Sequence, residues 1–471
     1  MRISHSRIAS FAATGLVPLW LGFAVMIGGS SQPNQLSHLL LQFVGGIIAM
    51  ACFIPAVNAP RSRTILLLSG LCSMLILWIV VQTLPLSKSV WSVLPDRSVI
   101  VEGWTYLGLN SDKAFPISFM PFETRTALLG FVPPVATLLL MLAIGRKKSG
   151  RTLYWVIPIL GAVSALLGVA QVTTNADAVL RWHAITNPTF ATGVFANVNH
   201  QSTLCLMCIP MTAALGARLR RDWEGGDDDV GKAAIVGGLL LTNLVGVLAA
   251  GSVAGYSLLL PILLFSFILF ARTSHSGERG TRTILALSTA TFLGSIALVA
   301  SSPMLERLGV TSFEDGDLSR IGVWRTSSEI AETHLFVGTG LGTFTETYRL
   351  YEPDGNITNR FVNNAHNDYL QTLIELGIPG MLIIAAVIGL FLVAFVRTWM
   401  TRDDEEYRFR RAAAVAVFVP ILHSFVDYPL RTPAIACLAV ACLVLMLAPL
   451  RSKQRSTVSG PSEPRPGHAV I

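Results

Sequence analysis

Stretches of about twenty mostly apolar residues recur along almost the whole chain, and this recurrence restricts its fold more than any other feature. A helix of about twenty apolar residues crosses the ~30 Å hydrocarbon core of a bilayer. Of the 471 residues, 52% are hydrophobic and 13% are charged, which is too apolar for a set of soluble domains. The sequence therefore predicts an all-α polytopic membrane protein.

About twelve of these stretches qualify as membrane spans, which makes residues 1–450 one integral membrane domain. The predicted spans are 11–29, 37–57, 64–84, 126–145, 152–171, 200–217, 233–250, 253–271, 283–301, 377–396, 412–428 and 433–450. The weakest are 200–217 and the pair around Gly251, for which a single re-entrant segment is the alternative. The first span follows two arginines, as a signal peptide would, but no small-residue cleavage site follows it, so we expect a retained anchor.

Lysine and arginine are unevenly divided between alternate connections. The set of connections that includes both termini holds 24 of the 35 lysines and arginines. Because cytoplasmic connections retain positive charge, we expect both termini in the cytoplasm. The long connections 85–125, 172–199 and 302–376 would then face the opposite compartment, a periplasm or external space, and residues 451–471 would form a disordered cytoplasmic tail. The net charge of +7 lies beside the membrane, so its expected partners are lipid headgroups and not nucleic acid.

All six cysteines fall inside apolar stretches, so none is expected in a disulfide framework. Cys205 and Cys208 form a C-x-x-C pair within a predicted span. Without a second pair of ligands, packing explains them more simply than metal or redox chemistry does.

The connection 302–376 is the most informative. Its pattern predicts short helices at 318–334 and 365–376, joined by turns rich in glycine. Its cations are all arginine, which suits bidentate binding of phosphate oxygens, although exposed arginines without a ligand are the ordinary alternative. They are Arg307, Arg320, Arg325, Arg349 and Arg360.

The stretch NNAHNDYLQTLIELGIPG, at 363–380, has the spacing of an amphipathic helix near the membrane surface. Asn363 or Asn364 suits its N-cap, and Gly377 can end it in the left-handed conformation. This places His366 in the first turn, where the helix dipole disfavours a positive charge on the ring.

A neutral histidine in that place is a candidate general base if Asp368 or an amide orients its ring. Helix capping and loop hydrogen bonds are the alternative role for His366 and Asn367. No second His or Cys lies at ligand spacing in this connection, which argues against a metal, although Asp368 and Glu375 could contribute to a distant coordination sphere.

Polar residues also gather at the ends of two spans. At the start of 200–217 the polar residues are Asn197, Asn199 and His200. They either cap the helix or bind sugar. At the end of 412–428, His423 and Asp427 are four residues apart on one helix face, with Arg431 beyond them. They either pair with each other or bind acceptor or carrier, as ionisable groups in membrane helices often do.

These residues resemble a known family. NNAHNDYLQTLIELGIPG is similar to the signature of the O-antigen ligase and polymerase superfamily, in which His-Asn leads a leucine-rich helix ending in Glu-Leu-Gly-x-x-Gly. Three more stretches resemble family segments in the same order, so the resemblance covers 192–431. They are TGVFANVNHQST at 192–203, RIGVWRTSSEIAETHLFVGTGLGTF at 320–344 and HSFVDYPLR at 423–431.

The resemblance implies a glycosyltransferase of the bacterial inner membrane, with its active site on the periplasmic side. Such an enzyme transfers or polymerises glycan from an undecaprenyl-diphosphate carrier onto an acceptor hydroxyl, in lipopolysaccharide O-antigen or exopolysaccharide biosynthesis, without a metal or another cofactor. The acceptor would be lipid A core or a growing polysaccharide, and polysaccharide-export or chain-length proteins would be further partners. His366 would be the base, and Arg320 would hold the diphosphate, with Arg325, Asn367 and Asp368 as further substrate contacts.

The chain also departs from the family pattern. Many relatives carry an arginine just before the Gly-x-Phe-x-Asn segment, where the nearest one here is Arg181, and many have Ser-Arg where this chain has Ser252 and Val253. Two alternatives stay open. One is a protein O-oligosaccharyltransferase of the same superfamily, and the other is a flippase or transporter of lipid-linked glycan, for which charged residues at mid-membrane and paired broken helices are typical.

Overall fold

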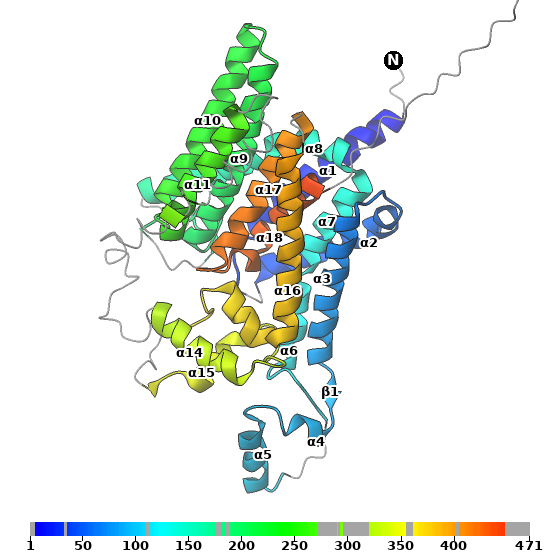
Figure 1. Ribbon diagram of the computed structural model, residues 1–471, viewed down its shortest axis with the longest axis vertical. Helices are drawn as coiled ribbons and strands as arrows, with labels where there is room; N and C mark the ends of the chain where they lie inside the picture. Colours follow the sequence, from blue (N-terminus) through cyan, green and yellow to red (C-terminus); the bar gives the residue numbers. More distant parts are fainter. Residues whose placement is uncertain are drawn as a thin grey trace, which may run out of the picture.

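The computed structural model describes residues 5–32, 35–109, 114–174, 180–183, 189–271, 290, 293–294, 320–354, 361–401 and 405–447. Of the predicted features, the tail 451–471 and nearly all of the span 283–301 lie outside these residues, as do Arg307 and Arg360. The described part of the chain is mostly helical, with almost no strand (Figure 1).

The helices follow one another along the chain with two very short strands between them. They are α1 His5–Ile27, α2 Leu36–Val57, α3 Arg63–Gln82, α4 Lys88–Trp91, α5 Arg97–Tyr106, α6 Pro121–Leu129, α7 Val132–Ile144, α8 Arg146–Thr173, α9 Val198–Arg221, α10 Asp227–Ala249, α11 Val253–Ala271, α14 Arg320–Thr333, α15 Phe344–Tyr351, α16 Asp368–Met400, α17 Glu405–His423 and α18 Pro433–Leu447. The strands β1 Pro85–Leu86 and β2 Phe115–Pro116 pair antiparallel, and a 3₁₀ turn covers Pro429–Arg431.

Within the described residues, eight helical segments are long and apolar enough to cross a membrane. They are α2, α3, α6 with α7, α8, α9, α10, α11 and α16. The chain is therefore an all-α polytopic membrane protein, as predicted, with eight and not twelve described helices that reach the length and hydropathy of a span. On either side of Gly251, α10 and α11 are two separate helices of this kind, and not one re-entrant segment.

Helix α9 lies at the centre of the bundle, packed against α8, α10, α11 and α17. In its most apolar stretch 78% of the residues are buried, compared with 50% or less in each of the other candidate spans. Because protein and not lipid surrounds it, α9 tolerates a polar start at residues 199–203, all of which are buried. Its low hydropathy explains why the sequence predicted this span only weakly.

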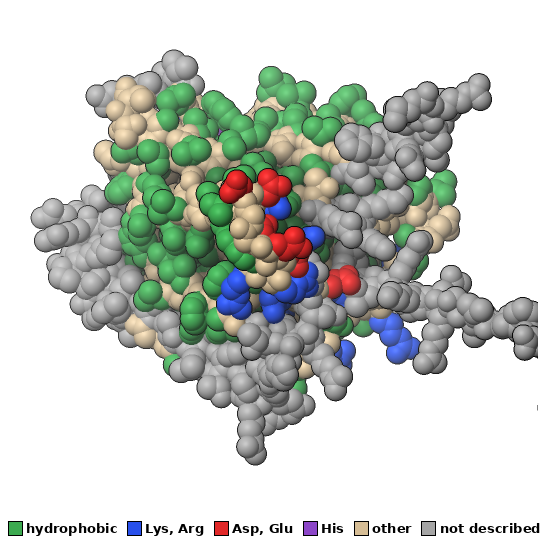
Figure 2. Space-filling view, turned by 90° about the horizontal axis from the view of Figure 1, so that it is seen from above, with side chains coloured by type: hydrophobic (Ala, Val, Ile, Leu, Met, Phe, Trp, Pro, Cys, Tyr) green, Lys and Arg blue, Asp and Glu red, His purple; other side chains and the backbone are tan. Residues whose placement is uncertain are grey.

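The turn between α9 and α10 is charged. Figure 2 shows acidic and basic side chains gathered at the tip of the molecule, with hydrophobic side chains around them. Arg221 pairs with Asp222 at 2.8 Å and Lys232 with Asp229 at 3.5 Å. These pairs are exposed or partly exposed, as expected for a connection outside the hydrocarbon core.

Helices α14, α15 and the first part of α16 lie at the other end of the bundle, and α5 projects beyond them (Figure 1). A small apolar core joins the three helices, with Val323 and Ile330 from α14, Phe344 and Tyr348 from α15, and Ile374 from α16. The leucines of the predicted amphipathic helix pack against this core, and its polar side is also buried. The helix is therefore enclosed by protein and does not lie free on a membrane surface.

The segment that carries α4 and α5 is attached to these helices through Asp96. This residue has a positive φ of 60°, and its carboxylate accepts hydrogen bonds from His334 at 2.9 Å and from the Tyr351 hydroxyl. His334 follows α14, and Tyr351 ends α15. The two helices are thus joined to α5 by a hydrogen-bonded cluster of three side chains.

Helix α16 is broken at Gly377, where φ is 62° and ψ is −165°. Three carbonyl groups just before the break accept hydrogen bonds from outside the helix: Thr339 N–H bonds to Ile374, Gly340 N–H to Glu375, and Trp78 Nε1 to Leu376 at 2.8 Å. The helix therefore ends at Gly377 with a positive φ, as predicted, but its ψ lies outside the left-handed helical region. Since unpaired backbone groups are costly in a membrane protein, these donors allow the chain to turn between the loop helix and the span.

We expect Gly377→Ala to lower the stability of the protein by more than about 2 kcal/mol, because this conformation is essentially restricted to glycine. A Cβ atom there would also lie 2.8 Å from Gly338 N and 2.9 Å from the Leu335 oxygen. Thermal unfolding of the detergent-solubilised protein measures the loss.

Gly389→Ala is the matched control, because this residue lies in the same helix and nothing lies within 4 Å of an added Cβ. It is expected to be neutral or to stabilise by about 0.5–1 kcal/mol. Equal effects of the two substitutions would contradict the assigned strain.

Candidate active site around His366

His366 lies just before α16 with φ at 49°, one of two non-glycine residues with positive φ in the described chain. Helix α16 begins at Asp368, and the Asn367 side chain is its N-cap, accepting hydrogen bonds from Tyr369 N–H and Leu370 N–H. The prediction that Asn363 or Asn364 caps a helix containing His366 was therefore wrong. A residue in the left-handed conformation cannot continue a right-handed helical turn.

The backbone on both sides of His366 is fixed. Ala365 donates its N–H to Gln371 Oε1 at 3.0 Å, and its carbonyl accepts from Trp324 Nε1 at 2.8 Å. On the other side, Asp368 N–H bonds to the Ser424 carbonyl at 2.9 Å. These bonds offset the cost of the left-handed conformation, which is about 1–2 kcal/mol. The first backbone N–H groups of α16 are thus hydrogen-bonded to other groups of the protein.

The ring of His366 faces a buried carboxylate. Its Nδ1 lies 3.1 Å from Asp427 Oδ1, while 28% of the His366 side chain is exposed and Asp427 has no exposed surface. An ionised carboxylate can only accept, so Nδ1 carries a proton, and in the neutral form of the ring Nε2 then presents a lone pair. Within the described residues Nε2 has no hydrogen-bond partner. This arrangement can take a proton from a group at the exposed edge of the ring.

Asp427 itself receives several contacts. Asn197 Nδ2 donates to its Oδ2 at 3.3 Å, and His200 Nε2 lies 3.8 Å from the same oxygen. Arg320 approaches the same turn, donating to the Val426 carbonyl at 3.4 Å. Burial opposes its charge, but the His366 hydrogen bond and the nearby His200 and Arg320 hold the pKa of Asp427 well below its usual range. The carboxylate is therefore ionised.

The place of Asp427 also corrects a prediction. Helix α17 ends at His423, and Asp427 lies in the following turn, so the two residues do not share a helix face. His423 is fully buried and its Nδ1 lies 2.8 Å from Thr203 Oγ1. Its contact is thus with α9, whereas Asp427 faces His366.

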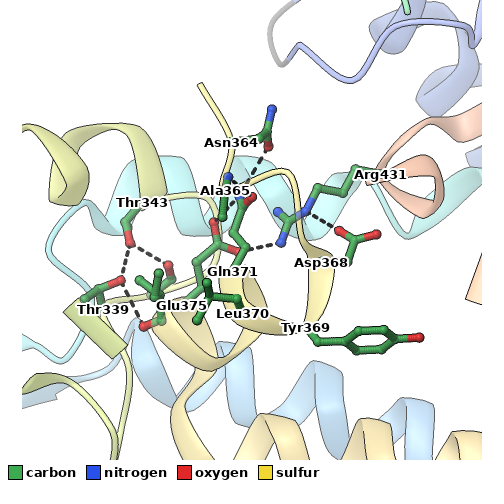
Figure 3. A network of polar contacts seen from close by, with 12 residues as sticks. Thr339, Thr343, Asn364, Ala365, Asp368, Tyr369, Leu370, Gln371, Glu375 and Arg431 are labelled. Carbon is green, nitrogen blue, oxygen red and sulfur yellow. Dashed lines mark hydrogen bonds and ion pairs between the residues drawn. The ribbon is translucent and has the colours of Figure 1, made fainter. Parts of the chain in front are cut away.

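A second buried cluster lies beside the first and is drawn in Figure 3. Arg431 Nε donates to Asp368 Oδ1 at 2.9 Å, and its Nη2 donates to Glu375 Oε2 at 3.1 Å. Gln371 extends the cluster from Glu375 Oε1 toward Asn364. Burial opposes the charge on Arg431, but the two carboxylates raise its pKa.

The two carboxylates of this cluster share one cation. Asp368 and Glu375 bind Arg431, and within the described residues no group of three His, Cys, Asp or Glu side chains is arranged to hold a metal ion. Arg431 instead joins the start of α16 to the turn after α17.

The remaining predicted residues lie in different surroundings. Asn199 is buried, and its Oδ1 accepts from Ser252 Oγ at 2.7 Å. Arg181 donates to the Phe190 carbonyl and the Thr192 hydroxyl of its own connection. Arg325 is exposed on α14, so Arg320 and not Arg325 contacts the turn that carries Asp427.

Tyr428 was not among the predicted site residues. Its ring centre lies 5.2 Å from those of both His366 and His200, and its hydroxyl contacts the side chains of Asn197 and Asn364. Burial raises the pKa of this hydroxyl, so it stays neutral. The signal for it was its place beside Asp427 in the stretch HSFVDYPLR.

We expect Arg431→Met to destabilise the protein by about 3–5 kcal/mol, because it leaves Asp368 and Glu375 without their counter-ion. Thermal unfolding in detergent measures this effect. Arg349→Met is the control, since Arg349 forms an exposed pair with Glu346, and its expected effect is below about 1 kcal/mol. A loss for Arg431→Met no larger than that of the control would show that the buried pairs contribute little.

A comparison with known families agrees with the motifs. Residues 238–385 match a family model described as O-antigen ligase, and the match includes Arg320, His366 and Glu375 but ends before Asp427. No curated protein matches the chain. Over these residues the chain is similar to the O-antigen ligase family, and the match supports a relationship to the O-antigen ligase and polymerase superfamily.

Proposed function

We propose that this protein transfers glycan from an undecaprenyl-diphosphate carrier to an acceptor hydroxyl, with His366 as the base. The observation that carries the proposal is the His366–Asp427 contact, which leaves Nε2 of a partly exposed imidazole available to a substrate. The family match supports a ligase or polymerase type of activity. The site would lie at the periplasmic face of a bacterial inner membrane, where a lipid-linked donor can present its diphosphate.

In the proposed reaction the acceptor hydroxyl gives its proton to His366 Nε2 as its oxygen attacks the anomeric carbon. The bond between that carbon and the diphosphate oxygen breaks, and undecaprenyl diphosphate leaves with the bonding electrons. Asp427 stabilises the imidazolium that forms, because its charge lies 3.1 Å from Nδ1. A single displacement of this kind inverts the anomeric centre.

Arg320 is the best-placed cation for the diphosphate. Its Nη1 bond to Val426 uses one of five N–H donors of the guanidinium, and the Val426 carbonyl directly precedes Asp427. An arginine can offer two parallel donors to phosphate oxygens and so stabilise the growing charge on the leaving group. Arg325 and Arg181 are more distant candidates for the carrier, and Asn197, Asn367 and Asp368 would act mainly by holding the site together.

The acceptor can be a growing polysaccharide, lipid A core or a protein hydroxyl. We favour a glycan acceptor, because the described chain consists of helices and short connections and contains no added soluble acceptor-binding domain. A flippase is the alternative from another class, and the test below separates it from a transferase.

His366→Gln is expected to lower glycan transfer by at least about 10²-fold, and Asp427→Asn by a similar factor, because each removes one part of the proton acceptor. The variants are expressed in a strain that lacks the native protein, and surface polysaccharide and lipid-linked precursor are both measured. Precursor that accumulates on the periplasmic face indicates a transferase, whereas precursor retained on the cytoplasmic face indicates a flippase.

His38→Gln is the control, because His38 is buried in α2, where its Nε2 contacts the Ser30 carbonyl and a glutamine keeps a donor. Wild-type amounts of surface glycan are expected for it. Normal surface glycan in the His366 variant would rule out the assigned base.

Arg320→Lys is expected to reduce kcat/KM for the lipid-linked donor by about 10-fold or more, because lysine loses the paired donors. Arg325→Lys changes an exposed residue of the same helix and is expected to have an effect of less than about threefold. Kinetics with purified protein and extracted donor compare the two. Equal losses in both variants would contradict the preference for Arg320.

A further inference from the structure

His200 is a buried histidine whose ring has no hydrogen-bond partner within the described residues. It lies in the first turn of α9, with 1% of its side chain exposed, and neither Nδ1 nor Nε2 is paired. Its ring contacts Phe195 and Tyr428 edge to face, at centre distances of 6.3 and 5.2 Å. A buried polar group left unpaired costs about 1–3 kcal/mol, so His200 is expected to serve a neighbouring polar group.

The nearest charged group to His200 is the Asp427 carboxylate. His200 Nε2 lies 3.8 Å from Oδ2, while His366 Nδ1 lies 3.1 Å from Oδ1. A small movement of either side chain brings Nε2 to hydrogen-bond distance. The carboxylate is therefore placed between two imidazoles, one on each oxygen, with Asn197 as a further donor to Oδ2.

Other groups also face this carboxylate. Arg320 of α14 adds a positive charge, and Asp368 of α16 adds a negative one. His423 of α17 and Tyr428 of the following turn interact with it electrostatically, and each has a side-chain partner of its own. His423 Nδ1 is paired with Thr203, whereas neither ring nitrogen of His200 has a partner among the described residues.

We propose that His200 is a positioning residue for the His366–Asp427 pair. Its Nε2–H donates to Asp427 Oδ2 and, with Asn197, holds the carboxylate so that Oδ1 stays directed at His366. The inference rests on the proposed function, in which His366 is the base, and it assigns no covalent or proton-transfer step to His200.

This role has a consequence for pH dependence. A donor on Oδ2 shares the negative charge of Asp427 and so weakens its hold on the imidazolium form of His366. Without His200 that charge acts more strongly on His366, and the ring keeps its proton to a higher pH. The acidic limb of the activity–pH profile therefore moves to higher pH when the donor is removed.

Two substitutions separate the donor from the shape of the ring. His200→Phe keeps a ring against Phe195 and Tyr428 but removes both nitrogens, whereas His200→Gln keeps an N–H near the position of Nε2. Thr212→Val is the control within α9, because the buried Thr212 hydroxyl donates to the Cys208 carbonyl of its own helix and has no other hydrogen bond among the described residues.

The assay uses the purified full-length protein and lipid-linked glycan extracted from membranes of a strain that lacks the native protein. Release of undecaprenyl diphosphate is measured from about pH 5 to about pH 9, around the usual titration range of histidine. We expect His200→Phe to lower the maximal rate by about 10- to 100-fold, as for lost supporting groups elsewhere. Its acidic limb should move up by about half a pH unit, while His200→Gln and Thr212→Val keep the wild-type limb.

A lower rate with an unmoved acidic limb in His200→Phe would overturn the proposal, because that result is typical of a packing role. So would a wild-type profile for His200→Phe. His366→Gln in the same assay separates the two levels of inference. If His366→Gln abolishes the release of undecaprenyl diphosphate while His200→Phe has no effect, only the role of His200 is wrong. If His366→Gln leaves this release unchanged, the proposed function fails, and this inference fails with it.

Discussion

A carboxylate without exposed surface, that of Asp427, determines how the site end of the molecule is assembled. An ionised group buried in protein needs donors around it, and Asp427 obtains them from His366 and Asn197, with the charge of Arg320 nearby. These residues belong to segments far apart in the sequence. The candidate site is therefore formed only when α9, α14 and the loop before α16 meet at the turn that follows α17.

The break in α16 makes this meeting geometrically possible. Gly377 lets the chain change direction between the helix that follows His366 and the membrane span, and donors from α3 and from residues 339–340 bond to carbonyl groups just before the break. The Arg431 pairs with Asp368 and Glu375 then join the start of α16 to the turn that carries Asp427. Two buried charge clusters and one broken helix thus support the position of a single imidazole.

The sequence predicted the helical membrane architecture well, because bilayer thickness sets the length of an apolar span and that length is visible in a single sequence. It also predicted the helix end at Gly377, where local chemistry decides. The predicted N-cap was wrong. The backbone before His366 is held by hydrogen bonds to Gln371 and Trp324, and Trp324 lies on another helix. The pairing of His366 with Asp427, 61 residues away, depends on helix packing and could not be predicted from spacing. The assignment of His366 as base stays a prediction.

The most direct test of the account is a double-substitution cycle on His366 and Asp427. If the two residues act as one proton acceptor, the protein carrying both His366→Gln and Asp427→Asn should transfer glycan no more slowly than His366→Gln alone, because the carboxylate has nothing left to orient. Rates of undecaprenyl diphosphate release from the four proteins give the coupling between the two residues. Losses that multiply, so that the double variant is slower than His366→Gln by the full factor of Asp427→Asn, would show that the two residues act independently and would contradict the account.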